Sequence, residues 1–143
     1  MKLLNGIVIV FVMTALLCSC SNSENNKSDY VYYFGFDKGQ KDDVVMYALM
    51  KKEAKESDNK DLYMEEYIGA SVNEVFEQFF EKHKDAYTGT VKEYAVGESV
   101  GEKGLEDLKV YIANSPKLHA KRKTTIFDSG AGFIYEKMEE KQQ

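Results

Sequence analysis

The chain has 143 residues and a formal net charge of −5 at pH 7, from 24 acidic and 19 basic residues. A protein this acidic is not expected to bind nucleic acid through its phosphates, or anionic lipid over its whole surface. Both cysteines precede residue 21, so a folded domain must be held by packing, for which 10 tyrosines and 8 phenylalanines are available.

The first 20 residues have the pattern of a bacterial lipoprotein signal peptide. Lys2 is followed by an apolar stretch over residues 3–17, which is shorter than the about 20 residues of a membrane-spanning helix. A lipoprotein signal carries an aliphatic residue three positions before the modified cysteine and a small residue directly before it. Leu17 and Ser19 occupy these places before Cys20, so we expect lipid on Cys20 and localisation on the outer face of the cytoplasmic membrane.

Cys18 is the competing candidate for lipidation. Its preceding residue is the bulky Leu17, so we expect Cys18 to leave with the signal peptide. A diacylglyceryl group on Cys20 supplies two acyl chains, which hold a protein at a membrane stably where one chain holds only marginally. Residues 21–29 are wholly polar and are predicted to form a flexible tether before a single domain over residues 30–143.

Three strands are predicted at the start of this domain. Residues 30–36 are rich in aromatic side chains, residues 44–50 form a nearly continuous apolar run, and residues 62–68 alternate. The three segments are expected to form an antiparallel meander, with a charged stretch over residues 51–60 between the second and the third.

The first helix is predicted over residues 72–84. Ser71 stands three residues before Glu74, which is the spacing of a capping box. The apolar residues then recur at helical spacing, namely Val72, Val75, Phe76, Phe79 and Phe80. We expect Phe76 and one of Phe79 and Phe80 to lie in the core.

The remaining elements follow in the order strand, helix, strand, helix. A fourth strand is predicted over residues 91–96, a helix capped by Ser99 runs toward Pro116, and a fifth strand covers residues 124–127. Gly130 and Gly132 are predicted to bracket a turn before a terminal helix over residues 133–141. This order indicates an α+β domain with one mixed, mainly antiparallel sheet of about five strands and about three helices.

The candidates for chemistry are few. His83 and His119 are the only histidines, and their spacing supports no zinc site, so both are interpreted as solvated and no metal or cofactor is expected. Residues 97–101 have the Gly-x-Ser-x-Gly spacing of a hydrolase nucleophile. The only later histidine is His119, so Ser99 is interpreted as a helix cap, and the chain is predicted not to be an enzyme.

A basic segment over residues 117–123 stands out in this acidic chain. Two readings stay open for it: a solvated connection, or a docking patch for an acidic partner or for lipid headgroups. The residues that would form the patch are Lys117, Lys121, Arg122 and Lys123.

From residue 33 onward, the chain resembles the N-terminal domain of the spore germinant receptor C-subunit lipoproteins, the Ger(x)C family. The resemblance is carried by residues 34–38, 67–71, 97–98, 103–108, 114–116 and 123–127, and by the lipid cysteine before them. It implies a non-enzymatic lipoprotein on the outer face of the spore inner membrane that contacts polytopic receptor subunits in germination. The alternative is an exported small binding lipoprotein of the cell envelope with no part in germination.

Overall fold

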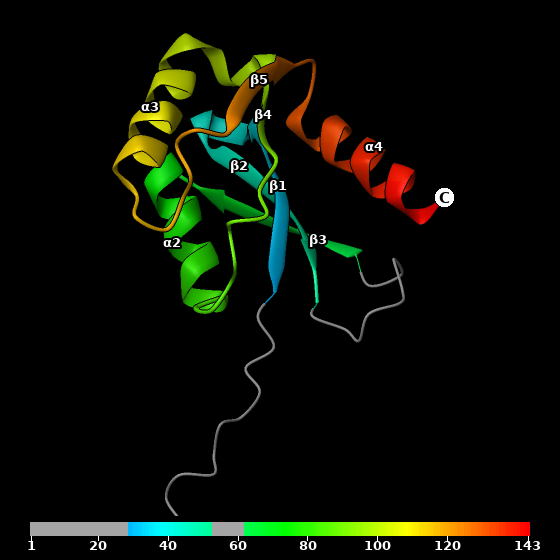
Figure 1. Cartoon of the computed structure of the whole chain (residues 1–143). Coiled ribbons are helices and arrows are strands. Elements are labelled where there is room, and N and C mark those ends of the chain that lie inside the picture. Colours follow the sequence, from blue (N-terminus) through cyan, green and yellow to red (C-terminus); the bar gives the residue numbers. More distant parts are fainter. Residues whose placement is uncertain (1–28, 53–61) are drawn as a thin grey trace, which may run out of the picture.

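The computed structural model describes residues 29–52 and 62–143, which form one mixed sheet with helices on both faces (Figure 1). The strands are β1 (Tyr30–Lys38), β2 (Val44–Lys51), β3 (Leu62–Gly69), β4 (Glu93–Gly97) and β5 (Lys123–Phe127). The helices are α2 (Val72–Lys82), α3 (Gly101–Asn114) and α4 (Gly130–Gln142), with 3-10 turns η2 (Gln40–Asp42) and η4 (Glu98–Val100). The predicted signal peptide, with Cys18 and Cys20, and residues 21–28 of the predicted tether lie outside the described residues.

The strand order in the sheet is β3-β2-β1-β4-β5. The first three strands form the predicted antiparallel meander. Strand β4 pairs with β1 in parallel, and β5 pairs with β4 in parallel. The predicted α+β domain with a mixed, mainly antiparallel sheet is therefore confirmed. Among the described residues, no helix combines the length and the apolar character that crossing a bilayer requires.

The two ends of the sheet differ in what they carry. Tyr30 and Lys51 pair at one end, which we call the N-terminal end, and Lys38 and Val44 pair at the other, which we call the hairpin end. At about 3.3 Å per residue, the nine residues of β1 separate the two ends by roughly 26 Å.

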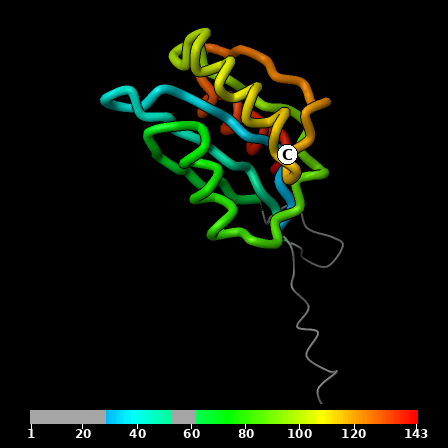
Figure 2. The backbone as a smooth tube through the Cα atoms, turned by 90° about the vertical axis from the view of Figure 1, so that its left-hand side faces the viewer, coloured from blue at the N-terminus to red at the C-terminus, as the bar shows by residue number. Residues whose placement is uncertain are grey.

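The main core lies between the sheet and helices α2 and α3, which Figure 2 shows side by side on one face. Ser71 caps α2 by accepting a hydrogen bond from the Glu74 backbone N–H at 3.2 Å, and the Glu74 carboxylate accepts one from the Ala70 N–H at 2.7 Å. The predicted cap at Ser71 is confirmed, and the reciprocal bond of the capping box is shifted by one residue, to the N–H of Ala70. Phe76 and Phe79 are fully buried, as expected, and the helix ends two residues earlier than predicted.

Helix α4 covers the opposite face of the sheet. Its N-terminus approaches the strands so closely that a Cβ on Gly35 would lie 2.7 Å from the Gly130 carbonyl oxygen, and one on Gly130 would lie 2.5 Å from the Phe36 backbone nitrogen. Glycine is required at both positions, because real side chains do not tolerate such distances. Phe133 and Ile134 then bury against the sheet.

The predicted turn at Gly130 and Gly132 is wrong, because both residues belong to the first turn of α4. The hydroxyl of Ser129 caps this turn and accepts a hydrogen bond from the Gly132 N–H at 3.1 Å. The Asp37 carboxylate, from the end of β1, accepts bonds from the N–H groups of Gly130 at 2.8 Å and Ala131 at 2.9 Å. With these contacts the helix begins at Gly130, three residues before the start at residue 133 that the apolar periodicity predicted.

The predicted helix cap at Ser99 is also wrong. Ser99 lies within η4, and its hydroxyl accepts a hydrogen bond from the Lys38 backbone N–H at 3.0 Å. Helix α3 begins at Gly101, whose φ of +73° places it in the left-handed region that favours glycine. Val100 takes the N-cap position and offers no side-chain hydrogen bond.

Candidate functional site

An open groove lies at the hairpin end of the sheet, between the β1–β2 turn, the start of α2 and the first turns of α3. Its volume is about 780 Å³. Charged side chains of both signs line it together with apolar ones, and the lining includes Asp42, Asp43, Asn73, Lys103, Asp107 and Val110. Val110 is 58% exposed, so the groove also offers an apolar contact that nothing in the described chain covers.

The β1–β2 turn holds one wall of this groove in an unusual backbone conformation. Lys41 and Asp42 both have positive φ angles, of 53° and 68°, which cost non-glycine residues about 1–2 kcal/mol each. The Asp42 carboxylate pairs with the Lys38 ammonium at 2.5 Å. The hydrogen bond from Lys38 lowers the pKa of Asp42.

A second depression continues between the C-terminal halves of α2 and α3. Tyr111 borders both hollows and stacks on Phe76, with ring centroids 4.7 Å apart. Phe80 is half-buried at this site, and the Lys117 ammonium lies 4.6 Å from its ring centroid. The face between α2 and α3 is therefore hollowed along most of its length.

The arrangement around Ser99 does not form a nucleophile–base pair. Its hydroxyl is engaged with the backbone of β1, and in the part of the chain that the structure describes no histidine hydrogen-bonds to it. His119 is exposed. An activated serine needs a base within hydrogen-bond reach, and none is placed there.

His83 is not solvated as predicted, because it bridges two carboxylates at the N-terminal end. Its side chain is 10% exposed, with Nδ1 at 3.1 Å from Asp29 and Nε2 at 2.7 Å from Glu65. The Lys82 ammonium also contacts Glu65, at 2.9 Å. Burial raises the pKa of Glu65, but hydrogen bonds from Tyr67, His83 and Lys82 outweigh it and bring the pKa to about 2.

This network holds Asp29 in place directly before β1. Asp29 is bound by His83 and by the Tyr63 hydroxyl, and its carbonyl accepts a hydrogen bond from the Tyr87 N–H at 2.8 Å. Burial, with the hydrogen bond to Asp29, raises the pKa of Tyr63. The entry of the chain into β1 is thus held at a defined place on the domain.

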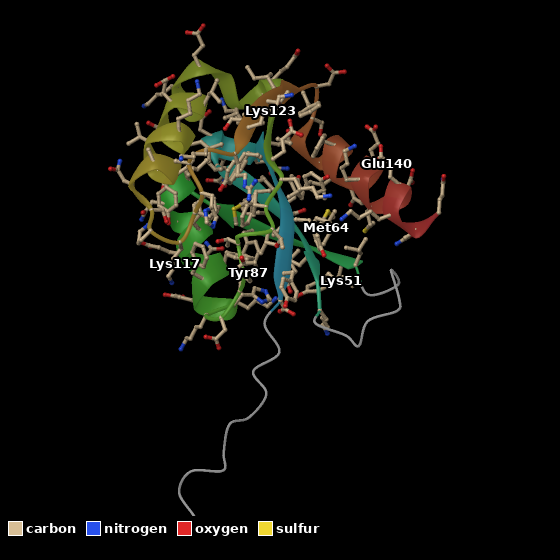
Figure 3. All side chains as sticks on the ribbon, in the orientation of Figure 1. Lys51, Met64, Tyr87, Lys117, Lys123 and Glu140 are labelled. Carbon is tan, nitrogen blue, oxygen red and sulfur yellow. The ribbon has the colours of Figure 1, made fainter. Side chains whose placement is uncertain are left out.

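The four predicted basic residues do not form one cluster. Lys117 lies over the Phe80 ring, and the Arg122 guanidinium donates to the Gly89 carbonyl oxygen at 3.0 Å. Lys121 and Lys123 are exposed. Figure 3 places Lys117 and Lys123 well apart, so Lys117 lies away from the end of the segment that carries Lys123.

The groove residues could not be identified from the sequence, because they come from three segments separated by up to about seventy positions. The pattern offers no signal that joins them. The described residues hold no group of three or more histidine, cysteine, aspartate or glutamate side chains placed to bind a metal ion.

Comparison with known proteins adds no relative: no protein-family model, no curated protein sequence and no solved structure matches this chain.

Proposed function

We propose that this chain is a lipid-anchored, non-enzymatic lipoprotein of the cell envelope that works by protein–protein contact. Following the resemblance to the germinant receptor C subunits, its partners are polytopic receptor subunits in the spore inner membrane. The observation that carries the proposal is the placement of the open groove at the end of the sheet opposite to Asp29.

This placement suits a tethered binding domain. Asp29 is nine residues from Cys20, so at most about 32 Å of chain separates the entry to β1 from the lipid. The N-terminal end of the sheet then stays within that distance of the lipid, and the hairpin end can lie roughly 26 Å further from it.

The character of the groove favours a protein or peptide partner. It is open, its charges are mixed, and an exposed valine lies among them. Enclosed, mostly apolar cavities are typical of small-molecule sites, and protein interfaces combine an apolar contact with a polar rim.

An exported binding lipoprotein with no part in germination is the alternative. The same anchor and the same groove support this alternative, and the two proposals differ in the partner that the groove binds. The experiment is therefore affinity purification of the tagged full chain from spore membranes, with identification of the proteins that accompany it.

A matched pair of charge reversals tests the groove. Asp107 lines the groove and its neighbour Glu106 does not, and both are exposed on α3. We expect Asp107→Lys to reduce recovery of the partner and Glu106→Lys to leave it unchanged, since only the first charge lies in the contact. A second arm reverses the exposed lysines Lys121 and Lys123, and a loss there alone would move the contact to the basic segment.

The anchor has its own test in the same membranes. We expect Cys20→Ala to release the protein from the membrane fraction and Cys18→Ala to leave it bound. Mass spectrometry of the mature N-terminus should find lipid on Cys20. Lipid on Cys18, or an uncleaved signal peptide, would refute the proposed anchor.

A further inference from the structure

Three lysines from separate elements lie close to the first residues of β1, at Tyr30 and Tyr32. The Lys141 ammonium, from the last turn of α4, lies 3.7 Å from the centroid of the Tyr32 ring. The Lys92 backbone N–H donates to the Tyr32 carbonyl oxygen at 2.8 Å. Lys51, at the end of β2, pairs with Tyr30 in the sheet. We call Lys51, Lys92 and Lys141 the lysine cluster.

The cluster carries positive charge that the described domain does not neutralise. Within residues 29–52 and 62–143, none of the three ammonium groups forms an ion pair with a carboxylate. Burial, with repulsion from Lys92 and Lys51, lowers the pKa of Lys141. Concentrated positive charge in a protein of net charge −5 indicates a surface that receives an anion.

Two acids at the N-terminal end are already engaged. Asp29 and Glu65 are held by His83 and Lys82. Lys52 lies beside the cluster in sequence, with its ammonium 5.6 Å from the Tyr63 ring centroid. Figure 3 shows Lys51 and Tyr87 toward the end of the molecule at which β1 begins. Lys51 therefore lies at the end of the sheet where β1 begins, which is the end that the sequence joins to Cys20.

We propose that the lysine cluster docks the domain on the headgroups of anionic phospholipids next to its own lipid anchor. The inference rests on the proposed lipidation of Cys20, which keeps this end of the sheet within about 32 Å of the bilayer. The aromatic ring of Tyr32 supports the ammonium of Lys141 at the interface, where amphipathic side chains are favoured.

Docking of this kind sets the orientation of the domain. A single flexible attachment lets a domain tumble, whereas a second contact beside the anchor holds the N-terminal end down. The groove at the hairpin end is then presented away from the membrane at a constant height. Each lysine near an anionic surface strengthens the contact about fivefold, so three contribute roughly 100-fold.

The test uses the mature lipidated protein in vesicles of phosphatidylcholine alone or of phosphatidylcholine mixed with phosphatidylglycerol. Acetylation of lysines by an amine-reactive reagent, followed by mass spectrometry, reports which ammonium groups are covered. We expect severalfold slower labelling of the cluster and of Lys52 in the anionic vesicles, and recovery of the labelling at high salt, which screens the contact.

Two triple variants of equal charge change complete the design. One replaces the lysine cluster with glutamine, and the other replaces Lys41, Lys103 and Lys109, which are exposed at the hairpin end and on α3. Lys52 remains in both variants and reports docking. We expect its protection to be lost in the first variant and kept in the second, with circular dichroism confirming that both are folded.

The outcomes separate the two proposals. Vesicle flotation with lipid on Cys20, but equal lysine labelling in the two kinds of vesicle, would overturn headgroup docking and leave the anchor standing. Equal loss of protection in both triple variants would also overturn it, since total charge and not the cluster would then drive the contact. Protein that carries no lipid on Cys20 would overturn the anchor and the docking together.

Discussion

The Asp37 carboxylate joins the end of β1 to the start of α4, and its removal should loosen the second layer of the fold. One oxygen accepts from the Gly130 N–H, and the other from the Ala131 N–H and the Ser129 hydroxyl at 3.1 Å. The site is crowded, since a Cβ on Gly97 would meet the Asp37 carboxylate. No other described side chain accepts hydrogen bonds from these two N–H groups.

The magnitude follows from the kind of bond. A hydrogen bond to a charged group contributes about 1.5–3 kcal/mol, and loss of a helix N-cap costs about 0.5–2 kcal/mol. The three bonds act on one helix end, and the site is part-buried, so water partly replaces them. We expect Asp37→Ala to lower the free energy of unfolding by about 2–4 kcal/mol, out of the roughly 5–15 kcal/mol of a typical domain.

Urea unfolding followed by circular dichroism measures this change, and hydrogen exchange localises it to α4. Asp37→Asn keeps the shape and one carbonyl acceptor, so we expect about half the loss. Asp85→Ala removes an exposed acid and serves as the control, with a change within about 0.5 kcal/mol. If Asp37→Ala matched the control, or if exchange in α4 stayed as slow as in the wild type, the carboxylate would not be what holds this helix.

Two further perturbations test the core and the polar network. Phe76→Ala should lower the free energy of unfolding by about 3–5 kcal/mol, because Phe76 is fully buried. Phe80→Ala, at a half-buried position of the same helix, should lower it clearly less. Equal losses in urea unfolding would mean that the packing is misassigned. Glu65 has a pKa near 2 in the fold, below its ordinary value of 4.5, so its contribution is present above about pH 4.5 and is lost as the pH falls toward 2. Glu65→Gln should lower the free energy of unfolding at neutral pH and make it fall less steeply as the pH is lowered from about 4.5 toward 2. If the urea midpoint fell equally steeply with pH in both proteins, Glu65 would not be the titrating group.

The elements that the sequence predicts well are those with local signals. Helix α2 combines a cap at Ser71 with an apolar stripe, and both are realised in the fold. The meander follows from three successive segments of strand length. Because these signals lie within a few residues of one another, no knowledge of the rest of the chain is needed to interpret them.

The predictions that failed depend on contacts across the fold. Ser99 has the spacing of a cap, but its hydroxyl is taken by the backbone of Lys38, which is 61 positions away. The start of α4 depends on Asp37, more than 90 positions away. His83 stands between Asp29 and Glu65, from two other segments. Such contacts between distant residues cannot be inferred from a single sequence, so each of these residues is assigned a role from its sequence neighbours instead.

Some of the residues that carry the family resemblance hold the layers of the fold together. Residues 34–38 carry part of it, and within them Gly35 gives α4 room to approach the sheet while Asp37 binds the start of that helix. Both residues act in the attachment of one layer to another. In this chain the motif thus serves the assembly of the fold, whatever the protein binds. The groove lies mostly outside residues 34–38. This motif therefore supports the architecture, and the contact made by groove side chains such as Asp107 decides the role.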